Sequence, residues 1–184
     1  MKKIIIIAAA LISLNTAANA QAANSSASQT VNLNLANAID ITFTGTGSTT
    51  GAAVNFAFNT VADYANGIQS SDYQIKVRSN KNFKVDVKTN STNFSYTGST
   101  SPAPSMPVSG VLSLMMAANQ TGGSLSGSFP SGQFGNLSSS SANLLNNCNN
   151  GSNQWFNVKY KANPGFAYPA GTYTVDVVYT ATQL

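Results

Sequence analysis

The final fourteen residues of the chain, 171–184, alternate between apolar and polar side chains. Successive side chains of a β-strand point to opposite faces, so this pattern predicts a strand with one apolar face. The strand begins at Gly171, and its apolar positions are Tyr173, Val175, Val177, Tyr179 and Ala181. Such a strand either pairs fully within its own sheet or offers an edge to another chain.

The rest of the chain also consists of short segments in which apolar and polar residues alternate, with turn residues between the segments. It has no convincing amphipathic helix. The alternating segments are residues 31–35, 39–43, 54–58, 73–77, 83–87, 108–116 and 155–160. This organisation predicts an all-β fold, an immunoglobulin-like antiparallel β-sandwich.

Residues 73–77 and 83–87 flank a short polar turn, which predicts a β-hairpin. Four basic residues lie at even-numbered positions of these two segments or just beyond them, on the side opposite the apolar residues: Lys76, Arg78, Lys84 and Lys88. They would line the outer face of the hairpin. This face is either a patch for acidic glycans and anionic surfaces or a solvated face whose lysines discourage edge pairing, and we favour the second interpretation.

The segment 122–153 is rich in Ser, Gly and Asn but carries dispersed apolar residues, so we expect a packed loop or an extra hairpin there. It contains Cys148, the single cysteine of the chain. An intermolecular disulfide or a reactive thiol is one interpretation. An unpaired loop cysteine without a role is the one we favour.

The amino-terminal residues have the pattern of a secretory signal peptide: Lys2 and Lys3, an apolar run over residues 4–14, and small residues at Ala18 and Ala20. We expect a signal peptide over residues 1–20, a flexible arm over 21–30 and a single sandwich domain over 31–184. The mature protein would be secreted, to the periplasm, the cell surface or the medium. Loss of the two lysines lowers the formal net charge from +4 to about +2, so nucleic acid is not expected as a partner. No stretch after residue 20 is long and apolar enough to span a bilayer, so no membrane span is expected.

Catalysis is not indicated. The chain has no histidine and no glutamate, which excludes the usual Ser-His and Cys-His arrangements and leaves five aspartates as the acids. No phosphate-binding loop is present. Asp63, Asn66 and Asp72 flank a turn, and we interpret them as turn residues instead of calcium ligands. We therefore expect no catalytic residues, no cofactor and no metal.

The carboxyl-terminal strand resembles that of chaperone–usher pilins, which carries a glycine fourteen residues from the end followed by alternating apolar residues; here that glycine is Gly171. Residues 170–174, Ala-Gly-Thr-Tyr-Thr, are similar to spore-coat-U-like secreted β-sandwich subunits. Residues 64–67 and 77–83 resemble small surface proteins of the Bacteroidetes type. Two departures stand out: Gln183 replaces the penultimate aromatic residue of pilins, and the paired cysteines common in spore-coat-U-like domains are missing.

The resemblance implies assembly by donor strands, in which the arm of one subunit fills a groove in the next. The inserting residues would then be Val31, Leu33 and Leu35, and the partners would be like subunits together with a periplasmic chaperone and usher. Otherwise residues 31–43 are the first strand of a self-complete sandwich, an alternative that we rank nearly equal and slightly favour.

We therefore expect a secreted, non-enzymatic surface-structural protein, a pilin-like or fimbrial subunit that assembles through the edge of its last strand. The alternative is a secreted β-sandwich module that binds a surface glycan or matrix through Trp155, nearby tyrosines and the long polar segment.

Overall fold

The computed structural model describes residues 24–45 and 47–184. The chain divides into two units, Met1–Leu35 and Ala36–Leu184, which are considered separately. Within the first unit, residues 24–35 have an extended, irregular backbone with exposed side chains. The signal peptide expected over residues 1–20 lies outside the described residues.

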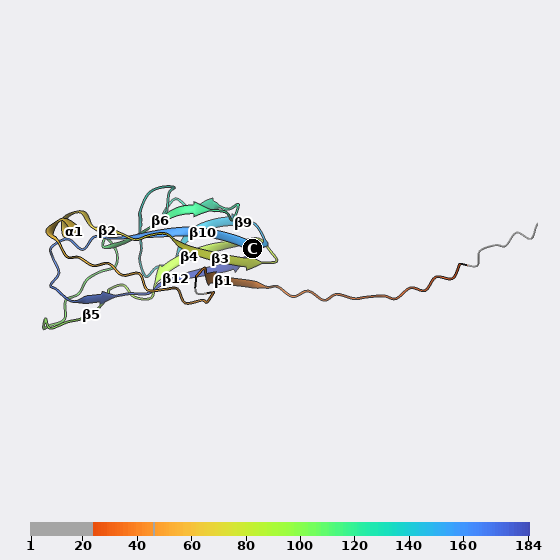
Figure 1. The fold of residues 1–184 in the computed structure, drawn as a ribbon, viewed down its shortest axis with the longest axis horizontal. Coiled ribbons are helices and arrows are strands. Elements are labelled where there is room, and N and C mark those ends of the chain that lie inside the picture. Colours follow the sequence, from red (N-terminus) through yellow and green to blue (C-terminus); the bar gives the residue numbers. More distant parts are fainter. Residues whose placement is uncertain (1–23, 46) are drawn as a thin grey trace, which may run out of the picture. The chain divides into compact units, whose positions relative to one another are not determined.

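The larger sheet of the second unit has the strand order β1-β3-β10-β6-β8, with β2 also pairing with β10 (Figure 1). Every pairing in it is antiparallel. Its strands are β1 (Ile39–Phe43), β2 (Ile68–Gln69), β3 (Tyr73–Ser79), β6 (Leu112–Asn119), β8 (Gly135–Asn136) and β10 (Gly151–Ala162).

The smaller sheet has the order β12-β4-β9-β7 and is also antiparallel. Its strands are β4 (Phe83–Thr89), β7 (Ser124–Leu125), β9 (Ala142–Cys148) and β12 (Val177–Gln183). A two-stranded ribbon pairs β5 (Ser95–Thr97) with β11 (Thr172–Thr174) shortly before β12. The predicted all-β fold and antiparallel β-sandwich are confirmed.

The core lies between the two sheets and follows the alternation of the sequence. Ile75 and Val77 of β3 and Val85 of β4 are fully buried. The alternate residues within each of these two strands face outward. Burying such a side chain contributes about 1.5–3 kcal/mol. One contiguous apolar core therefore holds the two sheets together.

The predicted hairpin of β3 and β4 is wrong. The two strands are consecutive, but β3 lies between β1 and β10 in one sheet, and β4 lies between β12 and β9 in the other. The polar turn between them is an arch that crosses from sheet to sheet. Both strands direct their apolar faces into the same core from opposite sides, so a local pattern of two alternating runs fits an arch as well as a hairpin.

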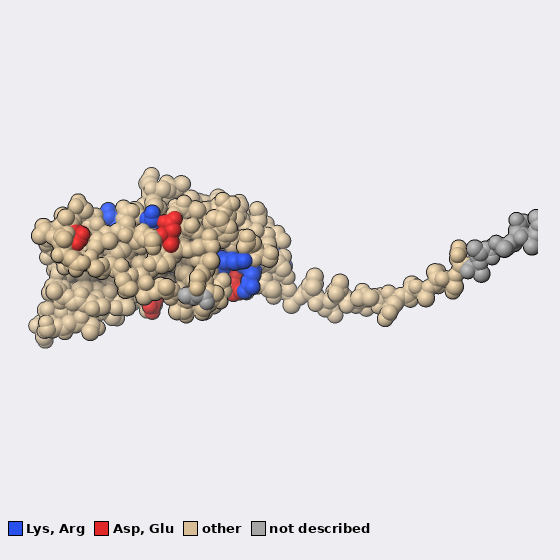
Figure 2. All heavy atoms as spheres, in the orientation of Figure 1, with Lys and Arg blue, Asp and Glu red and all other residues tan. Residues whose placement is uncertain are grey.

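The arch also separates the four basic residues, and the expected single basic face is wrong. Lys76 and Arg78 lie on β3, whereas Lys84 and Lys88 lie on β4. Several of the charges are neutralised locally: Arg78 pairs with Asp40, and Lys84 pairs with Asp86 at 2.8 Å. On the face shown in Figure 2, basic and acidic side chains lie singly or in small mixed groups on a largely uncharged surface.

Residues 122–153 supply strands to both sheets instead of forming a loop or a separate hairpin. The consecutive residues Leu144 and Leu145 of β9 are both fully buried. The register of β9 against β4 shifts near these residues, which breaks the period of two that identifies strands in sequence. Cys148 ends β9 in the core, where the Thr121 hydroxyl donates a hydrogen bond to its sulfur at 3.2 Å. Burial raises the pKa of this thiol.

A single short helix, α1 (Val61–Asn66), is present among the described residues. Asp63 and Thr60 form a capping box: the Asp63 carboxylate accepts from the Thr60 backbone at 2.7 Å, and the Thr60 hydroxyl accepts from the Asp63 backbone. These hydrogen bonds lower the pKa of Asp63. Asp72 instead pairs with Lys159 at 3.3 Å.

The described residues contain neither a candidate metal site nor a candidate membrane-spanning helix. No group of three or more metal-ligating side chains comes together in that part of the chain. No helix there has the length and apolar character that crossing a membrane requires.

Candidate strand-binding groove

The strand β12 is paired along one edge only. It pairs with β4, and flanking hydrogen bonds join Asn90 N–H to the Asp176 carbonyl and Leu184 N–H to the Asn82 carbonyl. These two hydrogen bonds involve even-numbered residues of the last strand. The backbone N–H and C=O groups of its even-numbered residues therefore point toward β4, and those of its odd-numbered residues point away from β4. No strand of the described residues pairs with that second edge. The odd-numbered residues are also those whose apolar side chains face the core.

A second unpaired stretch of chain lies opposite, over residues 52–58. Its side chains alternate: Val54, Phe56 and Phe58 are half-buried against the core, whereas Asn55 and Ala57 are exposed. Among the described residues, no backbone–backbone hydrogen bond reaches this stretch. It has the side-chain pattern of a strand without the pairing of one, so its backbone groups require water or a partner.

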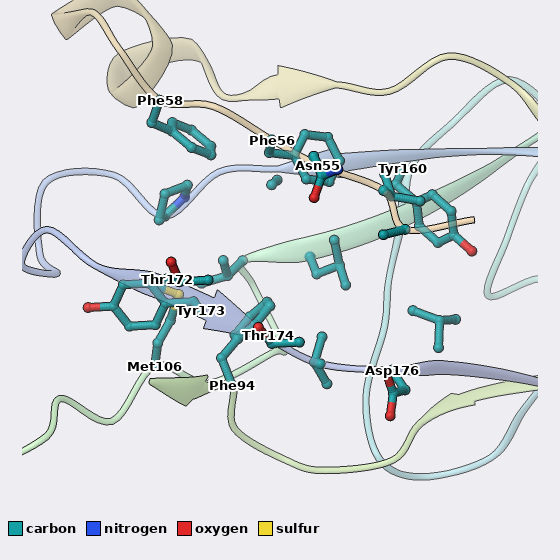
Figure 3. A pocket seen from close by; sticks show the side chains of 18 of the residues that line it. Asn55, Phe56, Phe58, Phe94, Met106, Tyr160, Thr172, Tyr173, Thr174 and Asp176 are labelled. Carbon is teal, nitrogen blue, oxygen red and sulfur yellow. The ribbon is translucent and has the colours of Figure 1, made fainter. Parts of the chain in front are cut away.

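A groove of about 940 Å³ separates these two walls. Figure 3 shows Phe56 and Phe58 on one side, and Phe94, Met106 and Tyr173 on the other. Apolar and aromatic side chains line much of the groove, as is typical of a site that binds an apolar ligand or segment.

A smaller cavity of about 140 Å³ continues from the groove between β1 and β12. Both spaces are lined by Phe43, Thr49 and Val177, and the smaller one extends to Tyr179. Beyond this cavity the two sheets are joined. The Gln183 side-chain amide donates to the Ala38 carbonyl and to Asn80 Oδ1, each at 2.9 Å. Gln183 thus closes this end of the groove.

Two tyrosines from opposite sheets meet where the groove narrows. The hydroxyl oxygens of Tyr160 on β10 and Tyr179 on β12 are 2.7 Å apart. Ring contacts with Phe43 and Phe156 hold Tyr179 in place, with centroids 6.1 and 6.2 Å away. Burial raises the pKa of Tyr160 to about 12 and raises that of Tyr179 well above its ordinary value, so both phenols are neutral at physiological pH.

Aromatic rings gather at the other end of the groove. Tyr64 stacks on Phe166 with centroids 5.6 Å apart, and Tyr96 contacts Tyr173 at 5.0 Å. Trp155 does not belong to this group, because it lies on β10 opposite Lys76 of β3 and outside the groove lining.

The residues predicted for the strand edge lie along the groove in order. Tyr173, Val175 and Val177 line the large groove, Tyr179 lines the small cavity, and Ala181 lies further along β12. Gly171 is at the rim, where a Cβ atom would overlap the ring of Tyr96.

The residues predicted to insert lie in the first unit. Val31, Leu33 and Leu35 are 74%, 81% and 88% exposed and belong to no strand. The contribution of residues 52–58 as the facing wall was not anticipated, although the alternation of Val54, Phe56 and Phe58 marks this stretch as strand-like in sequence.

Comparison with known proteins gives little beyond the fold. No protein-family model matches the chain, and no curated protein matches it. Among solved structures, one similar chain comes from a chaperone–usher pilus. It is 12% identical, covers 88% of this chain and 98% of its own length, and has a TM-score of 0.41. A likeness of this size does not identify a function.

Proposed function

We propose that this protein is a secreted surface-structural subunit that assembles with like subunits through the free edge of β12. A segment around Val31, Leu33 and Leu35 of one copy enters the groove of another and adds a strand to its smaller sheet. A chaperone that covers the groove before assembly belongs to the same proposal.

The observation that carries the proposal is the groove with two unpaired walls. A β-sandwich edge of this kind, lined by apolar side chains and backbone groups without partners, is suited to β-augmentation. The same chain carries three exposed apolar side chains at alternate positions. Their burial at about 1.5–3 kcal/mol each would supply a substantial gross driving force, from which the ordering of the segment must be subtracted.

The test compares the mature wild-type chain with Leu33→Asp and with the matched control Asn34→Asp. Both substitutions add one negative charge to the same segment, but only residue 33 has the inserting phase. Sedimentation velocity should show multimers for the wild type and the Asn34 variant, and monomers for the Leu33 variant. A wild type that stays monomeric at every concentration, or multimers unaffected by Leu33→Asp, would exclude this mode of assembly.

A further inference from the structure

The paired tyrosines at the narrow end of the groove have a hydrogen-bonding capacity that their mutual contact does not use. Tyr160 and Tyr179 have two hydroxyl protons, and one of them suffices for the 2.7 Å bond. No other side-chain or backbone acceptor among the described residues bonds to either hydroxyl. Phenol hydroxyls in such a site usually find a partner, so the pair offers a polar position at the end of an apolar groove.

The order of the residues that line the groove limits how a strand can enter it. Three core-facing residues of the β11–β12 stretch line its large part: Tyr173, Val175 and Val177. Next comes Tyr179, beside the β1 edge. The candidate segment likewise has three consecutive apolar positions in one phase, 31, 33 and 35, and the residue of that phase preceding them is Gln29. The segment carries no charge. The one charged residue of the facing stretch, Asp176, lies at the opposite phase, and its carboxylate accepts a hydrogen bond from the Asn90 side chain at 2.8 Å.

The direction of entry follows from the chain beyond Leu35. Asn80 fixes this chain to the folded unit, because its side chain donates to the Ala36 carbonyl at 2.8 Å and accepts from Ala38 N–H at 2.9 Å. The body of the inserting copy therefore begins within a few residues of Leu35. It would collide with β1 and Gln183 if Leu35 lay at the closed end, so Leu35 belongs near Tyr173 and the strand runs antiparallel to β12.

We infer that the Tyr160–Tyr179 pair binds the side-chain amide of Gln29 from a second copy. This contact sets the register of the inserted strand. The inference rests on the proposed function. Leu35 then lies opposite Tyr173, Leu33 opposite Val175 and Val31 opposite Val177. The Gln29 carbonyl accepts the phenol proton that the tyrosines leave unused. A strand with an apolar residue at this position would leave that proton without a partner, so the groove selects for a polar one.

The first experiment tests the register by mixing full-length mature variants that each carry one new cysteine. Leu33→Cys mixed with Val175→Cys should form an intermolecular disulfide under mild oxidation, because opposed residues of an antiparallel pair have suitable Cα separations. Leu33→Cys mixed with Val177→Cys is the control and should cross-link much less. A preference for the second mixture overturns the register. Cross-linking within a single chain that carries both cysteines, at a concentration where it is monomeric, overturns the second copy as the occupant.

The second experiment tests the polar position by the dissociation rate of wild-type multimers after dilution. Gln29→Leu should speed dissociation about tenfold, whereas the outward-facing control Asn32→Leu should change it less than twofold. In a Tyr160→Phe/Tyr179→Phe background, checked for its fold by circular dichroism, Gln29→Leu should no longer speed dissociation. Equal effects of Gln29→Leu in both backgrounds overturn the inference. A wild type that is monomeric overturns the proposed function itself. Multimers whose dissociation rate is unchanged by Gln29→Leu overturn only the inference.

Discussion

The neighbouring strands β4 and β12 have the same length and the same alternation, yet they differ in burial. The inward residues of β4, Phe83, Val85 and Val87, are at most 1% exposed. Their counterparts across the ladder on β12 are only half-buried. The difference is one neighbour: β4 pairs on both edges, whereas β12 pairs on one edge.

This contrast shows that alternation determines which side of a strand faces the core, but the number of paired neighbours determines how deeply that side is buried. The core-facing side chains of β12 are less buried because they line the groove. The predictions that follow test whether β4 supports the fold of the isolated chain and β12 is left incomplete.

The largest effect is expected for Phe83→Ala on β4. Phe83 is fully buried, and removal of a buried phenylalanine leaves a cavity that costs about 3–5 kcal/mol. Urea unfolding followed by circular dichroism measures this loss. A loss below about 1 kcal/mol would show that the core collapses around the site and that β4 is less critical than its burial implies.

Alkaline pH should act on β12 through its tyrosine pair. The folded-state pKa of Tyr160 is raised from 10.0 to about 12, so the folded state holds this proton more tightly than the unfolded state does. Its contribution to stability is therefore complete below about pH 10 and is lost as the pH rises toward 12. At about 1.4 kcal/mol per pKa unit, the loss is on the order of 2 kcal/mol.

The measurement is the free energy of unfolding between pH 9 and 12, with Tyr160→Phe/Tyr179→Phe as the control. This variant should show a flatter profile over that interval. Identical profiles for the two proteins would mean that the pair does not govern the alkaline limit.

Matched truncations on the two strands give the most direct comparison. Val85→Ala should destabilise the monomer by about 2 kcal/mol, and Val177→Ala by about 1 kcal/mol, because Val177 keeps part of its solvent contact. The same urea titrations measure both values. If β12 is completed in a multimer, the cost of Val177→Ala should rise toward that of Val85→Ala there. Equal costs in the monomer would contradict the contrast between the strands.

The smallest effect is expected at the closed end of the groove. Gln183→Leu removes the amide that reaches the Ala38 carbonyl and Asn80, which should cost about 1 kcal/mol. Thr182→Ala, an exposed neighbour on the opposite face, is the control and should be near neutral. Hydrogen exchange at the start of β1 should increase in the Gln183 variant only. Unchanged exchange there would show that Gln183 does not tie the sheets together.

The fold class was predictable because alternation is local. The faces of β4 and β12 follow directly from Val85, Val87 and Val177 taken at every second position. The arch between β3 and β4 was not predictable in the same way, since its turn residues serve equally for a hairpin. The distinction depends on which distant strands flank each one, and that is a property of the whole sandwich.

One part of the groove was predictable from the sequence, namely the apolar phase of β12. Whether the second edge of β12 stays unpaired was left open, because alternation shows which side of a strand faces the core and not how many neighbours the strand has. The facing wall at Phe56 and Phe58 alternates like any strand, and nothing local indicates that its backbone would stay unpaired. Leu144 and Leu145 were hidden for another reason, because a shift of register places two consecutive side chains in the core.

The buried position of Cys148 has a consequence for handling the protein. Its sulfur is inaccessible in the folded chain, and burial keeps the thiol protonated and therefore slow to react with oxidants. Covalent dimers can then arise only from molecules that oxidise before they fold or after they open. The amount of covalent dimer that a reducing agent converts to monomer on a denaturing gel therefore measures how much of the protein misfolded during production and purification.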